Sequence, residues 1–239
     1  MSEIVLFRLE IEIFMVRKEI TWLGHAAFKA EIGENVIFFD PWISGNPMCP
    51  IKDVKEIEKA TLVLVSHDHS DHGFDDAVKI CKNTGATFVG VFELAQEARK
   101  RGVEKTVGGN IGGEVKVDDI TVFFTPALHS SSIGVPCGFV VRTPELTIYH
   151  AGDTGFFSEM EDISKLYEID VAILPIGSTY TMGPKEAALA VEKLKPKIVI
   201  PCHYNTFPQI KQDPQEFKRL VEERCRVEIL EPGKSLIIP

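Results

Sequence analysis

The sequence predicts a fold that combines helices and strands, with two sheets and helices outside them. Apolar runs bounded by turn residues alternate with segments of helical periodicity along the chain. The first half is richer in hairpins, such as the one expected over residues 115–125, whereas the second half alternates strand and helix more regularly. No linker rich in proline, glycine or serine separates the halves, so we expect a single domain over residues 1–239.

The expected elements follow from apolar runs and from helical spacing. Strands are predicted at residues 20–23, 27–32, 36–39, 62–65, 87–91, 120–125, 138–142, 147–150, 171–174, 198–200, 227–230 and 235–238. Helices are predicted over residues 74–81, 92–101, 158–166, 184–194 and 214–223. Pro184 and Pro214 stand where a first-turn proline is tolerated, and Gly85 and Gly102 follow helix ends.

Composition and charge exclude several classes of protein. Of the 239 residues, 44% are hydrophobic and 26% charged, which excludes a disordered chain or a small disulfide scaffold. The 35 acidic residues outnumber the 26 basic ones, and the net charge is −9. We therefore expect no binding to nucleic acid or to an anionic membrane surface.

The cysteines and the first fourteen residues indicate the cellular compartment in which we expect the protein. Five cysteines form no Cys-x-x-Cys pair, so we expect reduced thiols and a cytoplasmic protein. Charged residues interrupt the apolar run of residues 1–14, which argues against a signal peptide. These residues are interpreted as an N-terminal extension: either an extra edge strand or a start-site artefact, with Met15 as an alternative start. No run reaches the ~18 uncharged apolar residues of a membrane-spanning helix.

Histidines carry the functional information. Three of the seven fall in Ser66-His-Asp-His-Ser-Asp-His72, directly after the apolar strand predicted at residues 62–65. In extended geometry His67 and His69 project to the same side, so two imidazoles can share one ion. Asp71 and His72 come after the chain has turned and could serve a second ion. Imidazole nitrogen and carboxylate oxygen suit Zn²⁺ and similar ions, although a solvated loop that caps the next helix is the alternative interpretation.

This segment resembles the signature of the metallo-β-lactamase-fold hydrolases, His-x-His-x-Asp-His. Later motifs of that superfamily also occur in order, each at a predicted strand end, and the resemblance covers residues from about 20 to 239. The matching positions are Asp40 in Phe-Phe-Asp-Pro-Trp, His129 after residues 121–128, Asp153 in Gly-Asp-Thr, and His203 in Ile-Pro-Cys-His. Trp22-Leu-Gly-His-Ala26 and Met182-Gly-Pro-Lys-Glu-Ala-Ala188 resemble the UPF0173 group, which is related to ascorbate-6-phosphate lactonase.

The resemblance implies a fold and a catalytic centre. The fold would be the α+β, four-layer αββα sandwich, with two mixed sheets packed face to face. One ion would be held by His67, His69 and His129, and a second by Asp71, His72 and His203, with Asp153 bridging both. Zn²⁺ is the first expectation, and Mn²⁺ or Fe²⁺ would also suit the ligands. A hydroxide on the metal pair would attack a small ester, lactone or phosphoester, and Asp71 or a further histidine would deliver the proton.

Three further residues are expected near the site. Asp40 would orient a ligand imidazole through a hydrogen bond. His25 lies near the site in the resembled group, so we expect it to contact substrate or a ligand. Tyr204 directly follows a ligand position and is expected to line the pocket.

Two other functions remain open from the sequence. A ribonuclease Z-like phosphodiesterase would share the ligand set, but nuclease members usually carry a nucleic-acid-binding arm that this acidic chain lacks. A non-catalytic metal-binding protein of the same fold would be expected to have lost a ligand, and none of the seven is missing. The expected partner is thus a small-molecule substrate, with no nucleic acid and no membrane; assembly into a homo-oligomer would fit the fold.

Overall fold

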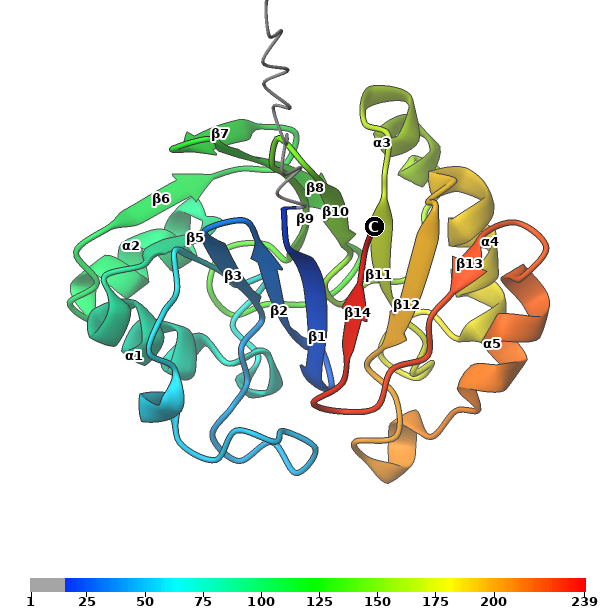
Figure 1. Cartoon of the computed structure of the whole chain (residues 1–239), viewed down its shortest axis with the longest axis horizontal. Helices are drawn as coiled ribbons and strands as arrows, with labels where there is room; N and C mark the ends of the chain where they lie inside the picture. Colours follow the sequence, from blue (N-terminus) through cyan, green and yellow to red (C-terminus); the bar gives the residue numbers. More distant parts are fainter. Residues whose placement is uncertain (1–15) are drawn as a thin grey trace, which may run out of the picture.

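The computed structural model describes residues 16–239, and it contains two seven-stranded sheets. Figure 1 shows the sheets in the middle of the molecule and helices on both flanks. The expectation about residues 1–14 lies outside the described part of the chain. Within that part, no helix is long and apolar enough to cross a membrane.

The first sheet has the order β14-β1-β2-β3-β4-β5-β6. Strands β14, β1, β2 and β3 pair antiparallel, whereas β3 to β6 pair parallel. The interior strand β4 is buried throughout, as its three apolar residues require. The strands are β1 Lys18–Gly24, β2 Ala27–Ile32, β3 Asn35–Phe39, β4 Leu62–Leu64, β5 Thr87–Val91, β6 Thr106–Gly109 and β14 Ser235–Ile237.

The second sheet has the order β13-β12-β11-β10-β9-β8-β7. It repeats the plan of the first, because β7 to β10 pair antiparallel and β10 to β13 pair parallel. Strands β11 and β12 are buried along their whole length, which suits parallel strands covered on both faces. The strands are β7 Glu114–Val117, β8 Ile120–Pro126, β9 Cys137–Arg142, β10 Thr147–His150, β11 Val171–Pro175, β12 Ile198–Cys202 and β13 Arg226–Val227.

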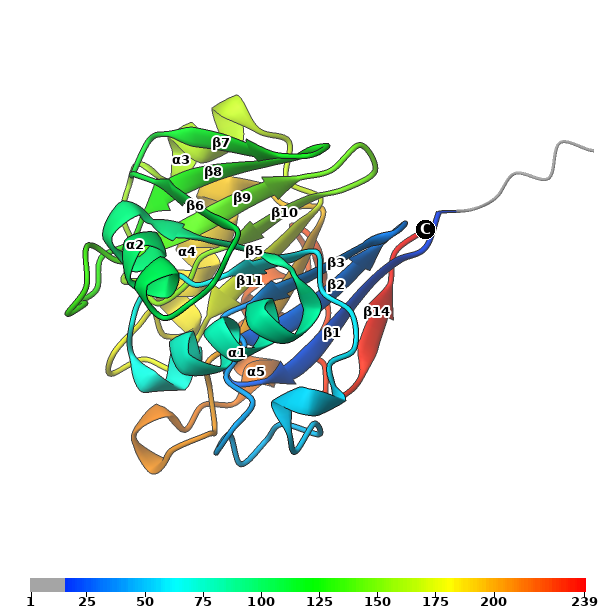
Figure 2. The same cartoon turned by 90° about the vertical axis from the view of Figure 1, so that its left-hand side faces the viewer.

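Helices cover the outer face of each sheet. Helices α1 (Phe74–Thr84) and α2 (Phe92–Lys100) pack on β4, β5 and β6. Helices α4 (Pro184–Leu194) and α5 (Pro214–Val221) lie against β11 and β13, and α3 (Met160–Leu166) packs on α4. Between the sheets, the ring of His150 stacks on Phe39 with centroids 5.3 Å apart. Figure 2 shows α1 and α2 outside the first sheet, so the predicted αββα sandwich is confirmed.

Some element boundaries differ from the prediction. The strand predicted at residues 227–230 ends at Val227, because Glu231, Pro232 and Gly233 lead into the turn before β14. Strand β6 was not predicted, since Thr106-Val-Gly-Gly109 offers one large apolar side chain; its parallel pairing with β5 determines its conformation. Short 3₁₀ turns at Val54–Glu56, Ser70–His72 and Pro208–Ile210 were also not predicted.

Candidate metal centre

Six strands end at the same edge of the two sheets, and a polar residue follows each. His25 follows β1, Asp40 follows β3, and the segment from Ser66 to His72 follows β4. In the second sheet, the residues that follow β8, β10 and β12 are His129, Asp153 and His203. Strands of a rigid sheet thereby hold side chains that are far apart in sequence close together.

Three imidazoles form a first group. His67 Nε2 lies 2.9 Å from His69 Nδ1, and His69 Nδ1 lies 3.3 Å from His129 Nε2. A tetrahedral zinc ion with Zn–N bonds of ~2.05 Å separates its ligand atoms by about 3.3 Å. The spacing of the three nitrogens therefore fits a single ion.

Asp40 determines which ring nitrogens of His67 and His72 face the site. It is fully buried after β3 and accepts hydrogen bonds from the Ser66 amide and hydroxyl, both at 2.7 Å. Because the Ser66 hydroxyl donates to Asp40, it accepts from His67 Nδ1 at 3.0 Å. Asp40 Oδ2 also accepts directly from His72 Nδ1 at 2.9 Å. Both imidazoles consequently turn Nε2 toward the site.

Asp153 joins the two sheets at the centre of the site. Its Oδ2 lies 3.0 Å from His203 Nε2, 3.2 Å from His72 Nε2 and 3.6 Å from His129 Nε2. Asp153 is almost completely buried, and its Oδ1 has no hydrogen-bond partner among the residues that the structure describes. This carboxylate thus occupies the position expected of a bridge between two ions.

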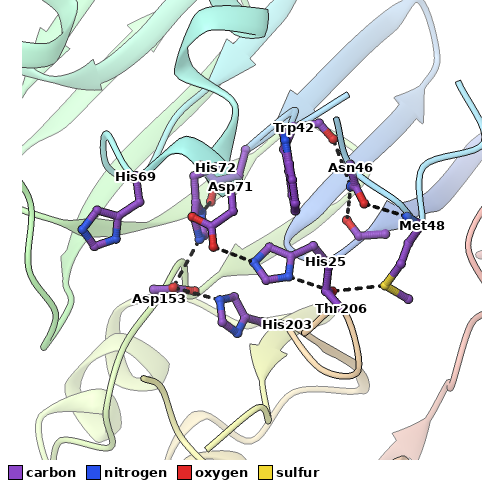
Figure 3. A network of polar contacts seen from close by, with 12 residues as sticks. His25, Trp42, Asn46, Met48, His69, Asp71, His72, Asp153, His203 and Thr206 are labelled. Carbon is purple, nitrogen blue, oxygen red and sulfur yellow. Dashed lines mark hydrogen bonds and ion pairs between the residues drawn. The ribbon is translucent and has the colours of Figure 1, made fainter. Parts of the chain in front are cut away.

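His25, His72 and His203 form a second group of imidazoles, and His25 lies closer to the other two than the sequence indicates (Figure 3). Its ligand atom lies within 4.8 Å of those of His72 and His203, and its ring is 4.0 Å from the His203 ring, centroid to centroid. Its Nε2 lies 3.3 Å from Asp71 Oδ2, and its Nδ1 lies 2.9 Å from the Thr206 hydroxyl. Asp71 therefore contacts His25. The ring nitrogen that lies close to those of His72 and His203 belongs to His25.

Burial and charge shift the pKa values in a way that suits ligands. Burial lowers the pKa of His67 to about 2 and that of His25 to about 4, so both rings are neutral at pH 7. Burial opposes ionisation of Asp153, but the His72 and His203 imidazoles hold its pKa well below the usual range. For His72, burial is outweighed by Asp153 and Asp40, which raise its pKa well above the ordinary value.

The chemistry of these donors fits a metal ion. Asp153 Oδ1 is buried without a hydrogen-bond partner in the described part of the chain, and His72 Nε2 faces the other oxygen of the same carboxylate at 3.2 Å. Burying an unpaired carboxylate oxygen costs free energy, and a cation bound there would satisfy it. The raised pKa of His72 has the same origin, because a proton there offsets two carboxylates in the way that a cation would.

A cleft of about 490 Å³ opens onto these groups. Its lining combines ligand candidates with residues from the loops that follow β11 and β12. The described residues in its wall are His69, Asp71, His129, Ser130, Asp153, Tyr180, His203, Phe207 and Gln209.

Tyr204 is the one candidate from the sequence that the structure places elsewhere. Its ring is buried and stacks on Trp22 with centroids 5.4 Å apart, and it is not in the wall of the cleft. Sequence reasoning missed Ser66, Thr206 and Phe207. A serine directly before the first histidine was the available signal for Ser66, whereas the other two depend on how the loop after β12 folds.

The fold and this donor cluster define a class of protein, the metal-dependent hydrolases of the metallo-β-lactamase superfamily. Residues 19–203 match the family model described as a beta-lactamase superfamily domain. Within that superfamily, the chain belongs to the UPF0173 metal-dependent hydrolases, because two relatives of that name are at least 53% identical to it over at least 91% of its length.

The relatives support this assignment over nearly the whole chain. A UPF0173 metal-dependent hydrolase of Caldivirga maquilingensis is 54% identical over 91% of this chain and 97% of its own length. A relative with the same name from Pyrobaculum islandicum is 53% identical over 92% of this chain and all of its own length. The structure of Igni18, a metallo hydrolase from Ignicoccus hospitalis, has a TM-score of 0.87 at 40% identity and covers 93% of this chain and 99% of its own.

Proposed function

We propose that this hydrolase uses two divalent metal ions, first of all Zn²⁺, to cleave a small ester, lactone or phosphoester. The observation that carries the proposal is the position of Asp153. Its one carboxylate oxygen lies within 3.6 Å of imidazoles from both groups, as a bridge between two ions requires. When bound, such a pair lowers the pKa of a water ligand to ~7 and stabilises negative charge on the substrate oxygen.

The first ion would be held by His67, His69 and His129. Their nitrogens lie within 4.8 Å of one another, and Ser66 and Asp40 hold His67 in the required tautomer. His69 and His129 are partly exposed and line the cleft, so this side of the site is open to substrate.

The second ion would be held by His72, His203 and Asp71, with Asp153 shared. Asp71 is the member with an exposed side, because 28% of its side chain is accessible and it lines the cleft. His25 would hold Asp71 in place through the 3.3 Å contact between Nε2 and Oδ2. The hydrogen bond with Thr206 would in turn orient the His25 ring.

Metal content and hydrolysis, measured on the same preparations, test the proposal. The parent protein, an Asp153→Ala variant and an Asp162→Ala control would be loaded with Zn²⁺ or Mn²⁺ and analysed by mass spectrometry. Asp162 is an exposed residue of α3 paired with Lys165, remote from the donor cluster in sequence and fold. We expect about two ions per chain in the parent and control, and fewer in Asp153→Ala.

The same three proteins would be assayed against lactones, carboxylic esters and phosphodiesters. Hydrolysis that depends on added metal and is lost in Asp153→Ala supports the proposal. A parent protein that stays metal-free after loading, or that binds one ion and is fully active, would contradict the two-ion mechanism. Cleavage of nucleic acid in preference to every small substrate would favour the nuclease alternative.

A further inference from the structure

We propose that the part of the substrate remote from the scissile bond is an uncharged, flat apolar group that packs against Phe207 and Tyr180. This inference rests on the proposed hydrolase function and narrows its substrate class. It is carried by the residues in the wall of the cleft that bind no metal in the proposed site.

Two exposed aromatic side chains stand in that wall. Tyr180 is 55% and Phe207 36% exposed, although large aromatic rings gain free energy when they are buried. Aromatic side chains that remain exposed inside a concave site are typical of ligand contacts. Both rings come from loops that follow parallel strands, the place where binding residues gather in such folds.

Phe207 is held in place from behind. Its ring stacks on Trp42, with centroids 6.0 Å apart, and meets the edge of the His25 ring at 5.5 Å. The adjacent Thr206 hydroxyl bonds to His25 Nδ1. Phe207 therefore forms a fixed wall next to the proposed second ion. A ligand that stacks on it does not have to immobilise a flexible side chain, so binding costs little conformational entropy of the protein.

The loop of Tyr180 is also fixed, at a cost in backbone strain. Ser178 and Thr179 have positive φ angles of 61° and 36°, which side-chain-bearing residues rarely adopt. The Thr179 hydroxyl donates to the carbonyl of Gln209 at 2.8 Å and so ties this loop to the segment that carries Phe207. Strain held by surrounding contacts is concentrated at ligand sites, and here it places Tyr180 in the cleft wall.

The described part of the cleft wall has no strongly basic side chain to pair with an anionic group on the part of the substrate remote from the scissile bond. Among the described residues in its wall there is no lysine and no arginine, and the acidic members are Asp71 and Asp153. Lys211 lines a different hollow, which shares Phe207 with the cleft. An anionic group remote from the reacting carbonyl would thus meet no lysine or arginine side chain in the described wall beyond the proposed metal ions, whereas a neutral ring would bury apolar surface against the two aromatic side chains.

Three lactones with the same reacting group separate these possibilities: γ-butyrolactone, its γ-phenyl derivative and its γ-carboxylate derivative. Metal-loaded parent, Phe207→Ala, Tyr180→Ala and Phe92→Ala proteins would be compared by kcat/KM. Phe92 is a matched control, because it is 55% exposed at the start of α2 and is not in the cleft wall. We expect the phenyl lactone to be the best substrate and the carboxylate the worst. The ratio of phenyl to unsubstituted lactone should fall about three- to tenfold in the two cleft variants and stay unchanged in Phe92→Ala.

Equilibrium binding separates a failure of this inference from a failure of the proposed hydrolysis. The probes are 5-phenyl-2-pyrrolidinone and 2-pyrrolidinone, lactams that resist hydrolysis, with the fluorescence of Trp42 as the signal because its ring contacts Phe207. If no lactone is cleaved but the phenyl lactam binds more tightly and Phe207→Ala abolishes the difference, the binding inference holds without the lactonase chemistry. Equal binding of the two lactams, or a carboxylate lactone cleaved as fast as the phenyl one, would overturn the inference.

Discussion

The two sheets contribute to the metal centre in different ways. In the first sheet, one segment after β4 carries three imidazoles within a few residues, and Asp40 holds two of them through direct and Ser66-mediated hydrogen bonds. In the second sheet, each of three strand ends contributes one group, namely His129, Asp153 and His203. Ligands in one segment share a support and move together, whereas ligands on separate strands depend on the spacing of the strands. Loss of the Asp40 support should therefore affect both proposed ions, whereas displacement of His129 or His203 alone should affect one.

Removing one proposed ligand from each sheet gives the largest expected effect. In His69→Ala and His203→Ala we expect each protein to lose one ion, and kcat/KM to fall at least about a thousandfold. Metal analysis and lactone hydrolysis measure both effects. Loss of both ions in His203→Ala alone would show that the second sheet holds the pair together, contrary to the comparison. Circular dichroism would show whether both variants fold.

Acidification should destabilise the metal-free protein through the imidazoles whose pKa burial lowers, namely His25 and His67 in the first sheet and His129 and His150 in the second. Burial lowers the pKa of His25 to about 4 and of His67 to about 2, so the unfolded chain binds protons from pH ~6.5 downward that the folded protein excludes. Their contribution to stability is thus complete above pH ~6.5 and is lost as the pH falls toward 4. His72, whose pKa is raised, is protonated in both states within this window. We expect the Tm of chelator-treated protein to drop between pH 6.5 and 4.5, corresponding to a few kcal/mol.

A His25→Gln variant sharpens this measurement. It removes one of the four imidazoles whose pKa is lowered and should flatten the pH dependence of Tm without abolishing it. A parent protein whose Tm is constant over the same range would contradict the assignment of neutral buried imidazoles.

The shared support in the first sheet is tested by Asp40→Asn. The amide keeps the shape of the side chain but accepts fewer hydrogen bonds, so His72 and, through Ser66, His67 lose orientation. We expect affinity for both ions to weaken between about 10- and 100-fold, measured by competition with a chelator. Asp76→Asn is the matched control: this carboxylate is also buried and accepts from the amides of Ile43 and Ser44, but it contacts no proposed ligand. If the affinity for only one ion falls, the hydrogen bond between Ser66 and His67 does not orient His67.

A glycine in the loop that follows β11 of the second sheet gives the smallest expected effect. A Cβ on Gly177 would overlap the carbonyl oxygen of His203 and lie 3.1 Å from its Nδ1. Gly177→Ala should displace His203 and lower the affinity for one ion about tenfold. This is the low end of the range for groups that orient metal ligands. Gly155→Ala is the control, because a Cβ there would meet nothing closer than 3.9 Å. Titration of zinc into both variants measures the difference, and an equal effect on both ions would break the distinction between the sheets.

The sequence predicted those parts of the structure that depend on neighbouring residues. The apolar strands, the helices with proline at the first turn and the histidine-rich segment after β4 follow from local patterns. The contributions of the second sheet were recognised through family resemblance, since a single histidine after a strand carries little information by itself.

What could not be predicted depends on contacts between distant segments. His25 meets Asp71 and Thr206 because β1 ends beside the loops that follow β4 and β12, and no local pattern encodes that proximity. Tyr204 lies in the core because the chain turns at His203, which has a positive φ of 53°. Likewise, the aromatic wall of the cleft arises from the packing of Phe207 on Trp42, two residues far apart in the sequence.

The position of Asp153 between the sheets also has a mechanical consequence. The cysteines in the described part of the chain are all free, so no disulfide ties one sheet to the other there. Ligands drawn from both sheets onto shared ions would act as a removable cross-link at this edge, closing a loop that spans most of the chain. Stripping the ions should then speed unfolding, because the edge can open before the apolar core between the sheets is disturbed.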